Sequence, residues 1–139
     1  GDLYDIAIVE HWVERLIELE ITRFSISDTI GCATPELMTD LFGLLKNDYP
    51  EIGFGAHFHT TPDTWQEKVE TAWNAGCNRF DGAMKGFGGC PMAKDKLTGN
   101  MPTENLLAYF KKLNIDHQLD EGAFVDALHR ANVIFSDYV

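Results

Sequence analysis

The sequence predicts an α/β fold with parallel strands, because short strand-like segments alternate with longer helix-like segments along the chain. One alternation takes about 25 to 30 residues, which is typical of the βαβ crossover that makes neighbouring strands parallel. Polar residues follow the strand-like segments, where parallel α/β folds carry their functional groups. The pattern fits an open three-layer sheet or a stretch of a (β/α)8 barrel, and the chain has room for about three strands.

Helices are predicted wherever apolar residues recur at three- and four-residue spacing. Thr34 and Pro35 are typical of a helix N-cap and first helical position, and Pro62 is expected to open the next helix. Five segments are predicted to be helical: residues 6–19, 35–45, 62–76, 106–113 and 122–135.

Strands are predicted where apolar, β-branched or aromatic residues form short runs that end at turn-forming residues. These runs are residues 23–27, 52–59 and 78–82. A glycine-rich stretch over residues 86–89 then opens a long loop that we expect to reach Asn100. We expect residues 1–139 to form a single unit, since no linker or low-complexity segment interrupts the alternation.

Composition excludes several classes of function. The formal net charge of -11 argues against binding to nucleic acid, which depends on clustered Lys and Arg. No apolar run approaches the roughly 18 residues of a membrane span, and the acidic first residues do not resemble a signal peptide, so we expect a cytoplasmic protein with no membrane partner. Cys32, Cys77 and Cys90 are widely spaced, which predicts reduced thiols.

Candidate functional residues stand at the ends of the predicted strands. His57 and His59 are two residues apart, so on a strand both rings project to one side and can reach one metal ion, although such a pair is also common in structural roles. Asp28 closes the first strand, where it could act in chemistry or accept backbone N–H groups of the following turn. Asp81 lies near the end of the third strand.

The loop after the third strand contains the remaining candidates. Cys90 follows two glycines and precedes a proline, a setting in which a thiol is less inert than in a helix face. The glycines permit a mobile lid, and a tight connection without function is the alternative. Lys85, Lys94 and Lys96 flank the loop and could meet an anionic ligand or simply be solvated.

With these residues in view, the sequence resembles the 3-hydroxy-3-methylglutaryl-CoA (HMG-CoA) lyase family of metal-dependent barrel enzymes over nearly the whole chain. The resemblance lies in residues 24–31 with 34–35, residues 57–59, and residues 86–93 running to 98–100 and 103–104. The GGCP sequence of the loop, followed by Gly-Asn, is the most specific element. The resemblance implies that the chain is the C-terminal half of such a lyase, forming roughly the last three βα units of a (β/α)8 barrel and a C-terminal helix.

The resemblance also implies the roles of individual residues. His57, His59 and the side-chain oxygen of Asn100 would bind one Mg²⁺ or Mn²⁺ ion, Cys90 would protonate an enolate, and Asp28 would handle substrate or protons. Ser25 and Thr29 match positions that contact substrate. The implied reaction cleaves the acyl-CoA substrate HMG-CoA to acetyl-CoA and acetoacetate, and a related acyl-CoA aldolase or synthase, or a metal-binding module without catalysis, is the alternative.

The sequence departs from the family pattern at several positions. Ser27 replaces a glycine, Thr60 and Thr61 replace the residues after the second histidine, and residues 127–131 differ from a pattern that we associate with coenzyme A. The first strand of the family, which supplies an aspartate ligand and an arginine, has no counterpart here. We therefore expect the isolated chain to be inactive and to associate with itself through unpaired barrel edges.

Overall fold

The computed structural model of the chain describes residues 4–89 and 98–136, and its centre is a parallel sheet. The three parallel strands lie side by side in the order of the sequence: β1 (Arg23–Asp28), β2 (Gly53–Thr60) and β3 (Phe80–Asp81). β1 pairs with β2 from Arg23 opposite Gly53 to Asp28 opposite Phe58. β3 continues the sheet on the other side of β2, where Asp81 lies opposite His57.

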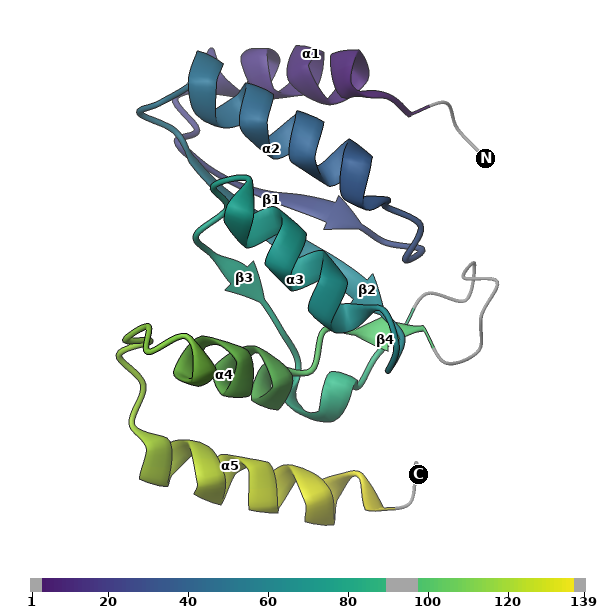
Figure 1. Ribbon diagram of the computed structural model, residues 1–139, viewed down its shortest axis with the longest axis vertical. Helices are drawn as coiled ribbons and strands as arrows, with labels where there is room; N and C mark the ends of the chain where they lie inside the picture. Colours follow the sequence, from purple (N-terminus) through teal and green to yellow (C-terminus); the bar gives the residue numbers. More distant parts are fainter. Residues whose placement is uncertain (1–3, 90–97, 137–139) are drawn as a thin grey trace.

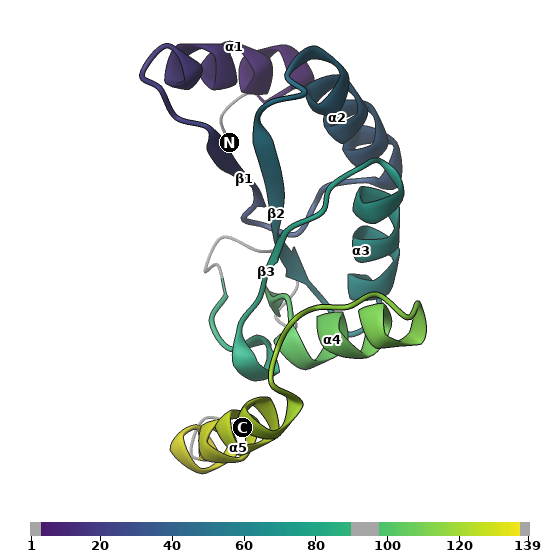
Figure 2. The same cartoon turned by 90° about the vertical axis from the view of Figure 1, so that its left-hand side faces the viewer.

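The helices cover one face of this sheet and leave the other face open (Figure 2). The helices that form this outer layer follow one another in chain order, as Figure 1 shows: α1 (Ile6–Ile17), α2 (Pro35–Asp48), α3 (Trp65–Asn74) and α4 (Thr103–Lys112). An open three-layer sheet has helices on both faces and a reversal in strand order. The sequential order and the single helical layer instead form an arc of a (β/α)8 barrel, and the predicted fold class is confirmed.

Local sequence explains where the helices begin. At the start of α2 the side chain of Thr34 accepts a hydrogen bond from the Leu37 N–H at 3.3 Å. α3 begins at Trp65, so the prediction of a start at Pro62 was wrong. The intervening residues form a turn instead, in which the N–H of Thr61 donates to the hydroxyl of Thr64 at 2.9 Å.

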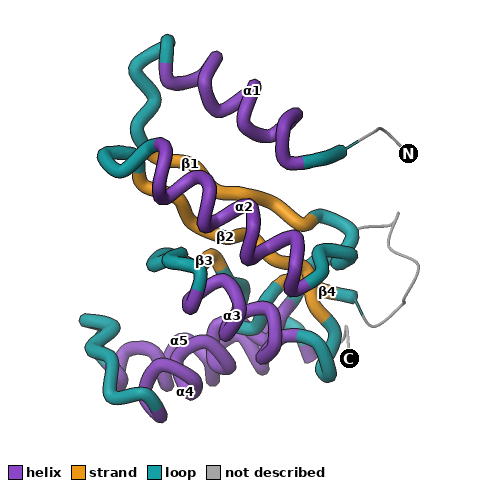
Figure 3. Tube along the Cα trace, turned by 45° about the horizontal axis from the view of Figure 1, so that its top comes forward, coloured by secondary structure: helices purple, strands orange, loops and turns teal. Residues whose placement is uncertain are grey.

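The hydrophobic core lies between the sheet and the helices, as Figure 3 shows for α2 and α3 against the strands. From the sheet it takes Phe24, Phe54 and Phe58, and the first two rings stack with their centroids 5.5 Å apart. From the helices it takes Leu45 and Val69, both fully buried. Successive residues of a strand point to opposite faces, so the residues next to each phenylalanine, such as His57 and His59 beside Phe58, face the open side of the sheet.

A fourth short strand was missed by the sequence, which predicted only a loop up to Asn100. β4 (Gly99–Asn100) pairs antiparallel with β2 and brings Asn100 opposite His59. Met101, the residue after β4, bonds to β2 on one side and to the segment after β3 on the other. Its N–H donates to Phe58 O at 3.1 Å, and its carbonyl oxygen accepts from the Ala83 N–H at 2.9 Å. β3 is shorter than the predicted strand over residues 78–82. After it the chain leaves the parallel sheet: Ala83 forms a bridge with Pro102, and the 3-10 turn η1 (Met84–Gly86) follows.

The last helix, α5 (Glu121–Ile134), lies beyond α4 at the end of the fold (Figure 1). Its contacts include a stack of Phe135 on Phe87, with ring centroids 4.2 Å apart, and an exposed ion pair between Glu121 and Lys111 at 2.8 Å. In the part of the chain that the structure describes, no helix has the combination of length and apolar character needed to cross a membrane.

The edges of the sheet bear on the expected self-association. Within residues 4–89 and 98–136, β1 and β3 each pair with β2 alone, so each has one edge without a strand partner. Such edges can pair with another chain. Association through them stays a prediction.

Candidate metal centre

The two candidate histidines lie on the open face of β2, near its C-terminal end. Their ring centroids are 5.6 Å apart and the ring planes are inclined by 52°. The two rings differ in exposure, because 37% of the His57 side chain is accessible whereas His59 as a residue is 7% exposed. The alternation of β2 explains the shared direction, since Phe58 between them is in the core.

One ring nitrogen of His59 is buried and available to bind a ligand. Its Nδ1 is inaccessible and has no hydrogen-bond partner among the described residues. Burial lowers the pKa of His59 below 6.5, the charges of His57 and Lys68 lower it further, and the carboxylate of Asp28 partly opposes them. The ring is therefore held neutral, which is the form that binds metal.

Asn100 joins the histidines through the antiparallel pairing of β4 with β2, in which it lies directly opposite His59. Its Nδ2 donates to Phe87 O at 2.8 Å, so the amide is held through its nitrogen rather than through the oxygen that a cation needs. Gly88 packs against the same amide: its φ is +88°, and a Cβ there would lie 2.6 Å from Asn100 Nδ2. Only glycine fits this position without displacing the amide.

Asp28, at the C-terminal end of β1, faces the helices rather than the open side of the sheet and is 8% exposed. Its Oδ1 accepts the N–H of Cys32 at 2.8 Å and its Oδ2 accepts the N–H of Ala33 at 3.2 Å. The same carboxylate forms an ion pair with Lys68, which is 4% exposed and also donates to His59 O at 3.2 Å. Asp28 thus supports the turn after β1 and, through Lys68, the backbone at His59.

Ser25 and Asp81 form a second polar cluster on the open face. The hydroxyl of Ser25 donates to Asp81 Oδ2, and the same oxygen lies 3.7 Å from His57 Nδ1. Ser25, which we predicted to contact substrate, therefore has an acidic protein partner. Thr29, the other predicted contact, lies on the exposed turn after β1.

The candidates that sequence reasoning missed are Lys68 and the contacts of Asp81. The sequence carried a signal for the side on which Lys68 and Asp81 lie, but not for their partners. Lys68 lies three residues after Trp65 and four before Ala72, on the buried stripe of α3. Asp81 follows Phe80, which contacts Phe110 in the helical layer, so alternation directs the aspartate to the opposite face.

The donors present fit a hard divalent cation in part. An amide oxygen, left available because the amide is held by its nitrogen, is a suitable ligand for Mg²⁺ or Mn²⁺, whereas the unpartnered imidazole nitrogen favours a transition-metal ion such as Mn²⁺ over Mg²⁺. Among residues 4–89 and 98–136, no three His, Cys, Asp or Glu side chains are arranged to hold a metal ion. Two imidazoles and one amide leave about three of six octahedral positions to other donors.

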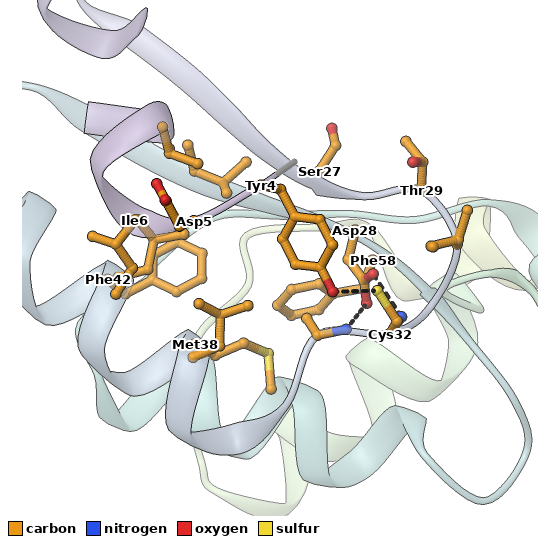
Figure 4. A pocket seen from close by; sticks show the side chains of 16 residues that line it. Tyr4, Asp5, Ile6, Ser27, Asp28, Thr29, Cys32, Met38, Phe42 and Phe58 are labelled. Atoms are coloured by element: carbon orange, nitrogen blue, oxygen red, sulfur yellow. Dashed lines mark hydrogen bonds between the residues drawn. The ribbon is translucent and has the colours of Figure 1, made fainter. Parts of the chain in front are cut away.

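A cavity of about 360 Å³ lies between the start of α1, the end of β1 and α2. Figure 4 shows Tyr4 at this cavity together with the apolar side chains of Met38 and Phe42. The hydroxyl of Tyr4 lies 3.6 Å from Cys32 Sγ. Asp28 and Thr29 also line it, but neither candidate histidine does. The cavity is therefore on the helical side of the sheet and does not belong to the candidate metal centre.

The predicted acid Cys90 lies outside the described residues, as do Lys94 and Lys96. Of the other thiols, Cys77 is 1% exposed, and burial raises its pKa to about 11, so it is inert near neutral pH. Lys85 is described: its Nζ lies 5.6 Å from the centre of the Phe87 ring, and its N–H donates to Glu104 at 3.0 Å. These contacts anchor the start of the glycine-rich segment on α4.

Comparison with known proteins gives consistent matches. Residues 3–130 match the model of the HMGL-like family. (R)-citramalyl-CoA lyase of Chloroflexus aurantiacus is 30% identical over 121 residues, which are 87% of this chain and 37% of that protein. The HMG-CoA lyase of Bacillus subtilis superposes with a TM-score of 0.85 at 29% identity, covering 98% of this chain and 45% of that one. An HMG-CoA lyase from Acinetobacter baumannii, solved with coenzyme A and 3-methylmalate, gives a TM-score of 0.79 at 29% identity over 92% of this chain and 42% of that one.

The fold and the polar strand ends define a segment of a (β/α)8-barrel protein whose functional groups collect at the C-terminal ends of its strands. Within that class, the chain belongs to the HMGL-like family, in agreement with the resemblance of its motifs to HMG-CoA lyases. It spans less than half the length of the relatives just described.

Proposed function

We propose that this chain forms the C-terminal part of a divalent-metal-dependent carbon–carbon lyase that cleaves HMG-CoA to acetyl-CoA and acetoacetate. The observation that carries the proposal is the convergence of His57, His59 and Asn100 at one end of β2 in a chain of the HMGL-like family. The names of the matched lyases support carbon–carbon cleavage of an acyl-CoA as the reaction class.

In this proposal the two histidines and the oxygen of Asn100 hold one Mg²⁺ or Mn²⁺ ion. When bound, the ion supplies Lewis-acid polarisation of substrate oxygens. The neutral state of His59 supports this role, because protons then compete less with the cation for its ring nitrogens.

Cleavage requires that the tertiary hydroxyl of the substrate lose a proton and that the acetyl-CoA carbanion gain one, so a base and an acid must both be present. We assign the acid to Cys90 and substrate contact to Ser25 and Thr29. A proton-handling role for Asp28 stays a prediction, because its carboxylate would have to exchange its bonds to Lys68 and to the turn after β1.

The described donors are too few for a complete centre, and we propose that a further ligand comes from the first strand of a complete barrel. The chain alone would then bind metal weakly and turn over no substrate. A lyase acting on a related acyl-CoA is the second candidate, and the identity to (R)-citramalyl-CoA lyase favours it.

Complementation tests the proposal. The chain is mixed with the N-terminal half of the Bacillus subtilis lyase, Mn²⁺ and HMG-CoA, and acetoacetate is measured. We expect acetoacetate only when both polypeptides and the metal are present, and none with His59→Ala in this chain. Cleavage of citramalyl-CoA but not of HMG-CoA would replace the substrate. A mixture that forms a complex without cleaving either thioester, while this chain binds Mn²⁺ tightly alone, would show a metal-binding module instead.

A further inference from the structure

We propose that Asp81 is a positioning residue that holds the ring of His57 in the orientation and tautomer that a metal ligand needs. The link to metal rests on the proposed function, whereas the contact between the carboxylate and the ring does not. The sequence singled out Asp81 only as a polar residue near a strand end.

The backbone places the two residues as direct neighbours. His57 and Asp81 are paired positions of parallel strands, so their side chains leave the open face of the sheet side by side. Asp81 Oδ2 lies 3.7 Å from His57 Nδ1, slightly longer than a hydrogen bond. At this distance the carboxylate acts on the ring through its charge, and an approach of about 0.5 Å would make a hydrogen bond of ordinary length.

The carboxylate is anchored from the opposite side. The hydroxyl of Ser25 on β1 donates to the same oxygen of Asp81 and so reaches across β2. The β2 residue opposite Ser25 is Gly55. Because Gly55 has no side chain, the guanidinium of Arg79 also crosses there: a Cβ on Gly55 would lie 2.5 Å from Arg79 Nε. Arg79 in turn donates to Phe24 O at 2.7 Å. These contacts connect all three parallel strands around the carboxylate.

The consequence concerns the hydrogen on His57. A carboxylate beside Nδ1 stabilises the tautomer with its hydrogen on that atom and leaves Nε2 with a lone pair for a cation. His59 differs, since its Nδ1 is buried without a partner among the described residues. The two histidines are therefore fixed by different means, and Asp81 supports only His57.

Nitrogen-15 NMR of the metal-free chain tests the contact directly. Long-range nitrogen–proton correlations at about pH 8, where an ordinary imidazole is neutral, report which ring nitrogen carries the hydrogen. We expect the Nδ1–H tautomer for His57 in the wild type and a redistribution toward Nε2–H in Asp81→Asn, with a smaller change in Ser25→Ala. Asp126→Asn on the exposed side of α5 removes the same charge and should leave the His57 signals unchanged. Preserved amide spectra show that each variant remains folded.

An Nε2–H tautomer in the wild type, or an Asp81→Asn variant with an unchanged tautomer, overturns the inference. A second measurement, Mn²⁺ affinity by paramagnetic relaxation, is expected to fall about 10- to 100-fold in Asp81→Asn and to hold in Asp126→Asn. Equal affinity in wild type and Asp81→Asn also overturns the positioning role. No Mn²⁺ binding by wild type, even together with an N-terminal half, contradicts the proposed function, whereas the tautomer result still decides whether Asp81 orients His57.

Discussion

Asp28 ends β1 and Asp81 ends β3, the two strands that flank β2, yet the two aspartates face opposite sides of the sheet. Asp28 points into the helical layer, where it is 8% exposed and paired with a buried lysine. Asp81 points to the open face, where 41% of its side chain is accessible and it lies beside His57. The face on which a strand-end acid lies therefore decides whether it supports the fold or remains available to a ligand.

The two clusters also differ in what their loss should cost. A buried ion pair that loses one partner leaves a charge without compensation in a low-dielectric surrounding, whereas an exposed carboxylate is solvated by water. Substitutions on the helical side should therefore cost more stability than matched substitutions on the open side.

The largest effect is expected from Lys68→Met, which leaves the carboxylate of Asp28 buried without its cation. The free energy of unfolding should fall by about 3 to 5 kcal/mol, measured by urea denaturation. Lys111→Met is the matched control, because Lys111 pairs with Glu121 on the surface, and it should cost at most about 1 kcal/mol. Equal losses in the two variants would contradict the structural role of the buried pair.

Gly88→Ala should have the next largest effect, and it acts on the open side. An alanine at φ +88° is strained by about 1 to 2 kcal/mol, and its Cβ would push the Asn100 amide from its place opposite His59. We expect weaker Mn²⁺ binding together with a lower urea midpoint. Gly43→Ala in α2 is the control, since no atom lies within 4 Å of the added Cβ, and it should leave metal binding unchanged. Mn²⁺ affinity equal to wild type in Gly88→Ala would separate Asn100 from the metal centre.

How much of this site the sequence could predict depends on the range of the interaction. The paired histidines and the strand-end position of Asp28 follow from local alternation. The face of Asp28 was also readable, because it shares its parity with Phe24 and Ile26 on the apolar side of β1. The partners were not readable: Lys68 reaches Asp28 from 40 residues away, and Ser25 reaches Asp81 from 56 residues away. The two-residue pairing of β4 with β2 is too short to leave a periodic signal.

A smaller effect is expected from pH, through His59 at the boundary of the two sides. Its pKa in the folded chain is lowered, chiefly by burial, so the unfolded chain takes up the proton first as the pH falls below 6.5. Above that pH both states are neutral and the ring adds no pH dependence. The urea midpoint should therefore decrease between about pH 7.5 and about pH 5.5, and the decrease should be shallower in His59→Gln. A steeper decrease in the variant would reverse the sign and contradict the lowered pKa.

The smallest change in stability is expected from Asp81→Asn, which tests the contrast between Asp81 and Asp28 directly. The side chain is accessible and asparagine keeps an oxygen that can accept from Ser25, so the free energy of unfolding should stay within about 0.5 kcal/mol of wild type. Asp28→Asn, the same chemical change on the helical side, leaves Lys68 as a buried cation and should cost about 3 kcal/mol or more. If the two asparagine variants lose equal stability in urea, then the face of the sheet does not separate the structural roles of the two aspartates, and the contrast between the helical side and the open side fails.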